Sequence, residues 1–176
     1  MARQQTLKQA KVATGSEKHL YTFEVLIVSG PLALSFVKKN KVISRTIQMR
    51  GDQTLEQLHQ AIFSAFEREE EHMYEFQVGG KGPMDPQARR YVLGLDDGGA
   101  GQEARAAGDV ERTTIGVLGV KENEAFGYWF DFGDDWWHQI NVLAIEEKIG
   151  GGKYPKVTKV VGKSPPQYVD WDEEEE

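Results

Sequence analysis

The side chains with the clearest chemical potential lie close together in the chain. His138 follows Asp131 and Asp134 within a short stretch, and carboxylates beside an imidazole can hold a divalent metal ion or share a proton. His59 and His72 could supply a further ligand. Two interpretations follow: a metal-binding or catalytic site centred on His138, or a structural turn followed by a buried, hydrogen-bonded histidine.

The residue types before His138 predict a β-hairpin. Gly133–Asp135 is typical of a turn, because glycine accepts a positive φ and aspartate bonds its own backbone. A three-residue loop there pairs Phe132 with Trp136, and the next pair is then Phe130 with His138. This register keeps on one core face the large side chains that recur at every second position, namely Phe126, Tyr128, Phe130, Phe132, Trp136, His138, Ile140 and Val142.

The opposite face of this hairpin carries Trp129 and Trp137. Stacked aromatic side chains on a surface can bind nucleic acid bases or a protein partner. The alternative is that a helix or the glycine-rich stretch 79–109 covers them, because large apolar patches are seldom left bare. Further along, Leu143 and Ile145 make both faces apolar, which predicts a central strand covered on both sides.

One long amphipathic helix is expected at residues 54–66. Thr54 and Gln57 form a Thr-x-x-Gln capping box at its start. Leu58, Ile62 and Phe66 recur at helical spacing and are expected to face a sheet. The fold class is therefore α+β, a mixed and mostly antiparallel sheet with this helix packed on it. The other expected elements are strands at 20–28, 42–49, 73–78 and 91–95, a helical turn within 113–120, and an edge strand at 154–161.

Composition limits the class of protein. The chain has 176 residues and no cysteine, which excludes disulfides and thiolate metal sites. No apolar run approaches the ~18 residues of a membrane span, and the first residues lack the pattern of a signal peptide. We expect a cytoplasmic protein with one domain at residues 19–168, a flexible arm at 1–18 and an acidic disordered tail at 169–176.

The formal net charge of −7 is concentrated in this tail. Asp170, Asp172 and Glu173–Glu176 contribute six negative charges, which leaves −1 for the rest of the chain. The sequence of the folded body shows no stripe of lysine or arginine, and an acidic tail repels phosphate. Binding to nucleic acid is therefore not expected with the tail present.

Three parts of the sequence resemble one prokaryotic family, which is named after the third open reading frame of plasmid pRiA4b and is found partly as passenger genes of transposable elements. The helix at 54–66 with the following His-x-Tyr-x-Phe at 72–76 is similar, and so is the Pro-Pro-x-Tyr ending at 165–168. The sequence departs from the family's Pro-x-x-Trp-Arg after the first strand, because no tryptophan occurs between Pro31 and Arg45. The most specific resemblance is the hairpin motif of Tyr128, Asp131, Gly133, Asp134, Trp136 and His138.

The resemblance implies an α+β domain without a defined biochemical role, and it supplies no catalytic residue or cofactor. We favour a non-catalytic interaction module with an unidentified protein partner, in keeping with an accessory protein of a mobile element. Trp129 and Trp137 are its candidate binding surface. The alternative is a small metal-dependent enzyme acting on nucleic acid, centred on His138, Asp134 and Asp131.

Overall fold

The computed structural model describes residues 16–94 and 106–172. The one long helix is α3 (Leu55–Ala65). The other helical elements are short: the 3₁₀ turns η1 (Ser16–Lys18) and η3 (Ile115–Leu118) and the helix α2 (Leu34–Lys39). The strands are β1 (Leu20–Ser29), β2 (Ser44–Arg50), β3 (Tyr74–Val78), β4 (Arg89–Val92), β5 (Gly108–Asp109), β6 (Ala125–Phe130), β7 (Trp136–Glu146) and β8 (Lys156–Val161).

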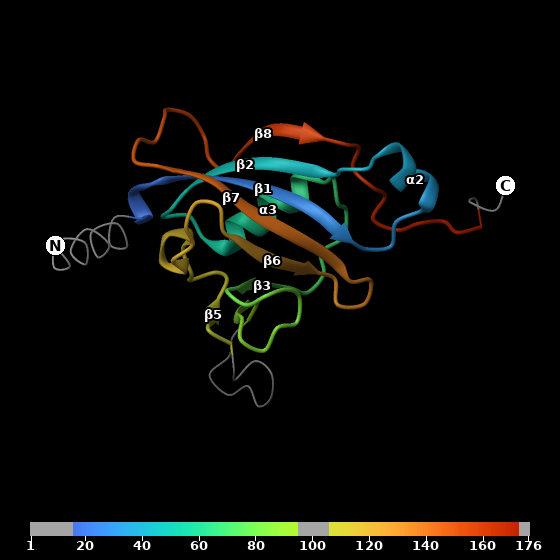
Figure 1. Ribbon diagram of the computed structural model, residues 1–176, viewed down its shortest axis with the longest axis horizontal. Coiled ribbons are helices and arrows are strands. Elements are labelled where there is room, and N and C mark those ends of the chain that lie inside the picture. Colours follow the sequence, from blue (N-terminus) through green and yellow to red (C-terminus); the bar gives the residue numbers. More distant parts are fainter. Residues whose placement is uncertain (1–15, 95–105, 173–176) are drawn as a thin grey trace.

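All eight strands form one open sheet in the order β5-β4-β3-β6-β7-β1-β2-β8. Every neighbouring pair is antiparallel except β4 and β5, which are parallel. The predicted mixed, mostly antiparallel sheet and the edge position of its last strand are confirmed. In Figure 1 the helix α3 lies behind the sheet, and no described helix crosses the near face.

The helix α3 begins at the predicted capping box. The Thr54 hydroxyl accepts the backbone N–H of Gln57, and the Gln57 side chain accepts the backbone N–H of Thr54. Leu58, Ile62 and Phe66 are buried against the sheet, as their spacing predicts. The prediction of one main helix holds in part, because the short helix α2, which buries no residue, is a second one.

The hairpin of β6 and β7 has the predicted faces but a different register. Phe130 pairs with Trp136 and Tyr128 pairs with His138, so the predicted pairing of Phe130 with His138 is wrong. The loop runs from Asp131 to Asp135, five residues instead of three. Because the register differs by two positions, the alternation is preserved and His138 still faces the core. The exception is Phe132, which lies in the loop and is 40% exposed.

The cause of the longer loop is the backbone at its two ends. Asp131 and Asp135 both have a positive φ, at 62° and 58°, which ends the strand geometry at these positions. The Asp131 carboxylate then accepts the backbone N–H groups of Gly133 and Asp134, at 3.0 and 3.1 Å. This local bonding is the usual way in which aspartate stabilises a turn.

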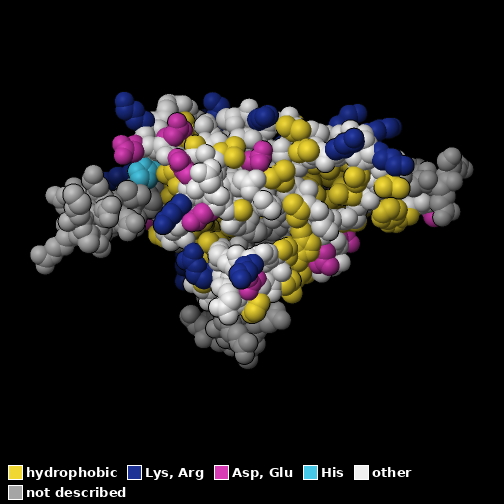
Figure 2. Space-filling model, in the orientation of Figure 1, with side chains coloured by type: hydrophobic (Ala, Val, Ile, Leu, Met, Phe, Trp, Pro, Cys, Tyr) yellow, Lys and Arg dark blue, Asp and Glu magenta, His cyan; other side chains and the backbone are white. Residues whose placement is uncertain are grey.

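The face of the sheet turned away from α3 is open. Leu143 lies at a register shift between β7 and β1 and is 47% exposed, so the prediction of a strand covered on both sides is wrong at this position. Figure 2 shows hydrophobic side chains exposed across this open face. Within the described residues no helix has the length and apolar character to cross a membrane.

Candidate functional site

Three aromatic rings pack against one another on the open face at the end of the hairpin. Trp129 and Trp137 are cross-strand partners, with ring centroids 4.8 Å apart and planes 11° from parallel. Phe132 packs on the other side of Trp129 at 4.1 Å. The indole N–H of Trp129 donates to the Asp135 carboxylate at 2.9 Å, which fixes the central ring. We call Trp129, Phe132 and Trp137 the aromatic shelf.

A groove runs beside the aromatic shelf. Its floor contains Gly127, which lies between Gln77 on β3 and Gln139 on β7 in the strand register. Because Gly127 has no side chain, the space next to Trp137 stays open, and the nearest heavy atom to a Cβ placed there would be 3.7 Å away. The loop from Gly79 to Pro83 forms the far wall. The groove measures about 300 Å³, the lower end of the range for ligand sites.

His138 lies directly behind this face, buried in the core at 2% exposure. Its Nδ1–H donates to the Tyr128 carbonyl oxygen at 3.2 Å, and its Nε2 accepts from Arg68 Nη2 at 2.8 Å. A carbonyl can only accept and a guanidinium can only donate, so the bonds assign the neutral Nδ1–H tautomer. Burial, followed by the positive charge of Arg68, holds the pKa of His138 well below its usual range.

Arg68 is the cation that occupies the centre of this region. Its guanidinium carbon lies 4.8 Å from the ring centroid of Phe130 and 5.1 Å from that of Trp136. Aromatic faces attract a cation, which offsets part of the loss of water around it. Burial lowers the pKa of Arg68 to about 10, so the side chain stays charged at neutral pH. The Arg68–His138 bond therefore ties the end of α3 to the hairpin.

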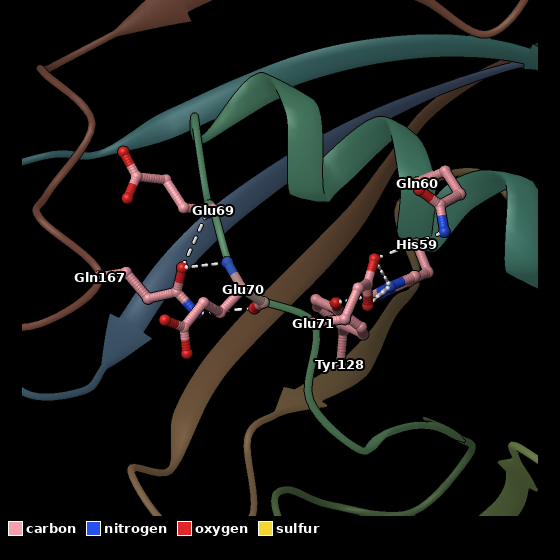
Figure 3. Close-up of polar contacts among 7 residues, drawn as sticks. All are labelled: His59, Gln60, Glu69, Glu70, Glu71, Tyr128 and Gln167. Atoms are coloured by element: carbon pink, nitrogen blue, oxygen red, sulfur yellow. Dashed lines mark hydrogen bonds and ion pairs between the residues drawn. The ribbon is translucent and has the colours of Figure 1, made fainter.

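A second chain of hydrogen bonds, which runs from the exposed Glu71 carboxylate into the core, joins α3 to the hairpin. The Glu71 carboxylate accepts from His59 Nε2 at 2.9 Å, and the Tyr128 hydroxyl donates to His59 Nδ1 at 2.6 Å. Figure 3 shows these three side chains grouped together below α3. The His59 ring also stacks on Tyr74, 3.7 Å between centroids and 3° between planes.

This order of carboxylate, imidazole and hydroxyl is the one by which enzymes activate a nucleophile. Here the hydroxyl belongs to Tyr128, whose side chain is fully buried. Burial also raises its pKa well above the usual value, which makes the phenolate harder to form. A substrate on the protein surface does not reach this oxygen. The arrangement therefore positions the hairpin on α3 and holds the aromatic shelf from behind.

The structure does not assemble the predicted metal ligands around His138. Both ring nitrogens of His138 are used in hydrogen bonds, so no lone pair remains for a metal ion. Asp131 has 6% exposure and its carboxylate holds the turn, whereas Asp134 is exposed. His72 Nε2 lies 3.5 Å from Asp131 Oδ2, a contact between the side chains of two of the candidate ligands. No group of three or more His, Asp or Glu residues in the described ranges is arranged to hold a metal ion.

The C-terminal segment closes over the end of α3. Gln167 Oε1 accepts the backbone N–H groups of Glu69 and Glu70, at 2.8 and 2.9 Å, and its Nε2 donates to the Glu70 carbonyl at 2.7 Å. Figure 3 shows this clamp beside the His59 chain. The Tyr168 hydroxyl donates to the Glu70 carboxylate and accepts from His72. The Pro-Pro-x-Tyr ending is thus part of the support of the same region.

Arg68 and Gln167 are the residues that the sequence reasoning did not identify. Arg68 stands within the acidic run from Glu67 to Glu71, a composition that is typical of a solvated segment. The sequence signal for Gln167 was its place inside the family-like ending, but the motif gave no role for it. Both residues act over long chain separations, 70 residues to His138 and 97 to Glu70.

Comparison with known proteins agrees with the fold and gives no activity. A protein of unknown function from Methanosarcina mazei Go1, MM3350, has a similar solved structure, with a TM-score of 0.64 and 22% sequence identity over 85% of this chain and 73% of that chain. No curated protein sequence matches the chain significantly. The family model described as plasmid pRiA4b ORF-3-like protein matches residues 31–171. The match covers most of the chain and contains the hairpin motif, and the protein belongs to the plasmid pRiA4b ORF-3-like family.

Proposed function

We propose that this protein is a binding module whose open sheet face takes up an extended protein segment. The observation that carries the proposal is the aromatic shelf beside the Gly127 groove. Aromatic rings at the centre of a contact contribute most of the affinity in many protein interfaces. Here Trp129 and Trp137 are stacked, Trp129 is hydrogen-bonded to Asp135, and the buried core lies behind them, so that little conformational entropy is lost on binding.

The shape of the groove indicates the chemistry of the partner. One wall is the flat face of Trp137, and the floor at Gly127 is flanked by the amide side chains of Gln77 and Gln139. Proline-rich and aromatic segments bind to such surfaces, because a flat ring packs on tryptophan while nearby amides bond the extended backbone. The partner is therefore an extended segment that presents a proline or an aromatic side chain. A small module of this kind suits an accessory protein of a mobile element.

Peptide selection on the intact protein tests this proposal. Peptides selected from an immobilised library on the wild-type protein are measured again on Trp137→Ala. Loss of a central aromatic side chain costs about 2 kcal/mol, so the dissociation constant is expected to rise by roughly 30-fold. The matched control is Val117→Ala, which removes an exposed apolar side chain on η3, outside the shelf.

The control variant is expected to bind the selected peptides as the wild type does. Enrichment of proline or aromatic residues among the selected peptides supports the stated partner. Equal binding by Trp137→Ala and the wild type contradicts the proposal, because the peptides would then contact another surface.

A further inference from the structure

Positive charge is concentrated in two segments of the chain. Residues 25–51 and 148–169 together contain ten of the 21 Lys and Arg residues and none of the 28 Asp and Glu residues. With a total of −7, the remaining residues carry a net charge of −17. Such a separation is invisible in the overall composition, because the two segments are about a hundred residues apart.

The fold places these two segments next to each other. The first contains α2 and β2, the second contains β8, and β8 pairs with β2 at one edge of the sheet. The Lys163 backbone N–H donates to the Asn40 side chain at 2.9 Å, and Arg45 Nη1 donates to the Val161 carbonyl at 3.0 Å. The first bond joins the chain after β8 to the end of α2, and the second joins the end of β8 to β2. In Figure 2, Lys and Arg side chains follow the upper margin, which in Figure 1 is the β8 edge.

An irregularity in β8 aligns two of its lysines. Lys156 pairs with Gln48 and Lys159 pairs with Thr46, with a register shift between them. Gln48 and Thr46 point to the same face, so Lys156 and Lys159 do too, although in a regular strand residues three apart point to opposite faces. Both lysines therefore lie on the open face of the sheet, the face that carries the aromatic shelf.

We call the exposed lysines of this margin the lysine edge; they are Lys38, Lys39, Lys41, Lys153, Lys156, Lys159 and Lys163. None of them forms an ion pair within the described parts of the chain. Our expectation of a folded body without a lysine or arginine stripe is therefore wrong. The stripe exists, but strand pairing assembles it from separate segments.

Protection of an exposed strand edge explains only part of this arrangement. Lysines on an edge strand hinder pairing with the strand of another chain, and Lys156 and Lys159 are placed for that. The lysines of the α2 end and the following turn are outside any strand, so edge protection does not require them. Because these lysines lie together with Lys163, we infer that the positive charge of this surface has a role other than edge protection.

We propose that the lysine edge binds the phosphate backbone of nucleic acid without reading base sequence. Lysine is a point charge on a flexible stem and contacts phosphates well, whereas base readout depends mainly on bidentate groups such as arginine. A row of lysines along the margin can contact successive phosphates, and the release of their counterions supplies the affinity. An acidic protein strand is a poorer fit, because the same lysines oppose strand addition along β8.

The test measures fluorescence anisotropy of a labelled mixed-sequence DNA duplex with the full-length protein over a series of salt concentrations. Seven lysine contacts limit the slope of log K against log salt to about −6 in the wild type. The variant Lys156→Gln/Lys159→Gln is expected to bind at least about tenfold more weakly at low salt, with a slope shallower by about 2. The matched control is Arg112→Gln/Lys121→Gln, which removes the same charge from exposed positions outside both the lysine edge and the groove.

The control variant is expected to bind DNA as the wild type does, which shows that the position of the charges matters and not their sum. Equal weakening of both double variants overturns the proposal, since binding would then follow net charge. Absence of DNA binding by the wild type at low salt also overturns it. If poly-glutamate binds in a manner that depends on the lysine edge while DNA does not, the surface is assigned to an acidic protein segment instead.

Discussion

Arg68 and His138 form a buried pair in which the arginine donates to the imidazole at 2.8 Å. The pair explains why this histidine is neutral and cannot serve as a general acid or a metal ligand. It also explains how the hairpin is held, since Arg68 leads out of α3 and His138 stands on β7. The hypothesis of a buried, hydrogen-bonded histidine is confirmed by this geometry, with a partner that the sequence did not indicate.

Replacement of His138 by alanine is expected to destabilise the protein. The variant leaves Arg68 Nη2 and the Tyr128 carbonyl without their partner, which costs about 1–3 kcal/mol for buried groups. The free energy of unfolding in denaturant measures the loss, with Gln139→Ala, an exposed neighbour on the same strand, as the control. An unchanged unfolding free energy in His138→Ala, or an imidazole that titrates freely by NMR, would contradict the structural role.

Stability is expected to fall as the pH is lowered through about 6.5, the ordinary histidine pKa. Burial holds the pKa values of His138 and His59 below that value in the folded protein, so the unfolded chain binds the extra protons first. The contribution of these two histidines to stability is therefore constant above this pH and decreases below it, by about 1.4 kcal/mol per pH unit for each histidine that stays unprotonated. Urea unfolding between about pH 7 and pH 5 gives the slope.

The variant His138→Gln separates the contribution of His138 to this pH dependence from that of His59. Glutamine keeps an acceptor for Arg68 but cannot be protonated, so its unfolding free energy should depend less on pH than that of the wild type. The difference in stability between the two proteins is then expected to narrow as the pH falls. A constant difference over the whole range would show that folding does not lower the pKa of His138.

Truncation in the contact of α3 with the sheet is expected to be costly. Ile62 has no exposed surface and lies in the main core cluster. Ile62→Ala removes buried methyl and methylene groups and leaves a cavity, which costs about 2–5 kcal/mol. Ser64→Ala on the exposed side of the same helix is the control. Thermal or denaturant unfolding that fails to distinguish the two variants would show that the core face of α3 is assigned incorrectly.

Removal of the final acidic residues is expected to strengthen binding to DNA. Pro165 and Val169 of the C-terminal segment line a hollow together with Leu32 and Phe36. The segment therefore passes close to α2, and the end of α2 carries part of the lysine edge. Deletion of Glu173–Glu176 removes four negative charges beyond this point and is expected to leave the melting temperature unchanged. Anisotropy with the same duplex measures the change. Weaker binding by the shortened chain would contradict the effect assigned to the tail.

The sequence predicted the faces of the hairpin better than its register. Alternation with a period of two decides which residues are buried, and a shift of two positions leaves that pattern intact. The positive φ of Asp131, which starts the turn two residues early, has no signature that separates it from an ordinary strand residue. The same limit explains Arg68, since a cation among glutamates indicates a solvated segment until the packing around it is known.

The lysine edge was beyond prediction for a different reason. Lys163 reaches the turn at Asn40, next to Lys41, only because β2 pairs with β8, and that pairing is set by the strand order of the sheet. The register shift that puts Lys156 and Lys159 on the same face is a local irregularity of this strand pairing, and the sequence carries no signal for it. Capping and helical spacing, by contrast, are local signals, and they placed α3 correctly from Thr54 onward.

The central claim, that the groove beside the aromatic shelf takes up an extended segment, is tested most directly with Gly127→Val. Gly127 has an ordinary strand conformation and no heavy atom within 3.7 Å of the Cβ position, so valine fits the strand and fills the groove without removing any aromatic ring. We expect Gly127→Val to keep the melting temperature of the wild type and to lose binding of the peptides selected on the wild type. Peptide binding by Gly127→Val equal to that of the wild type would contradict it.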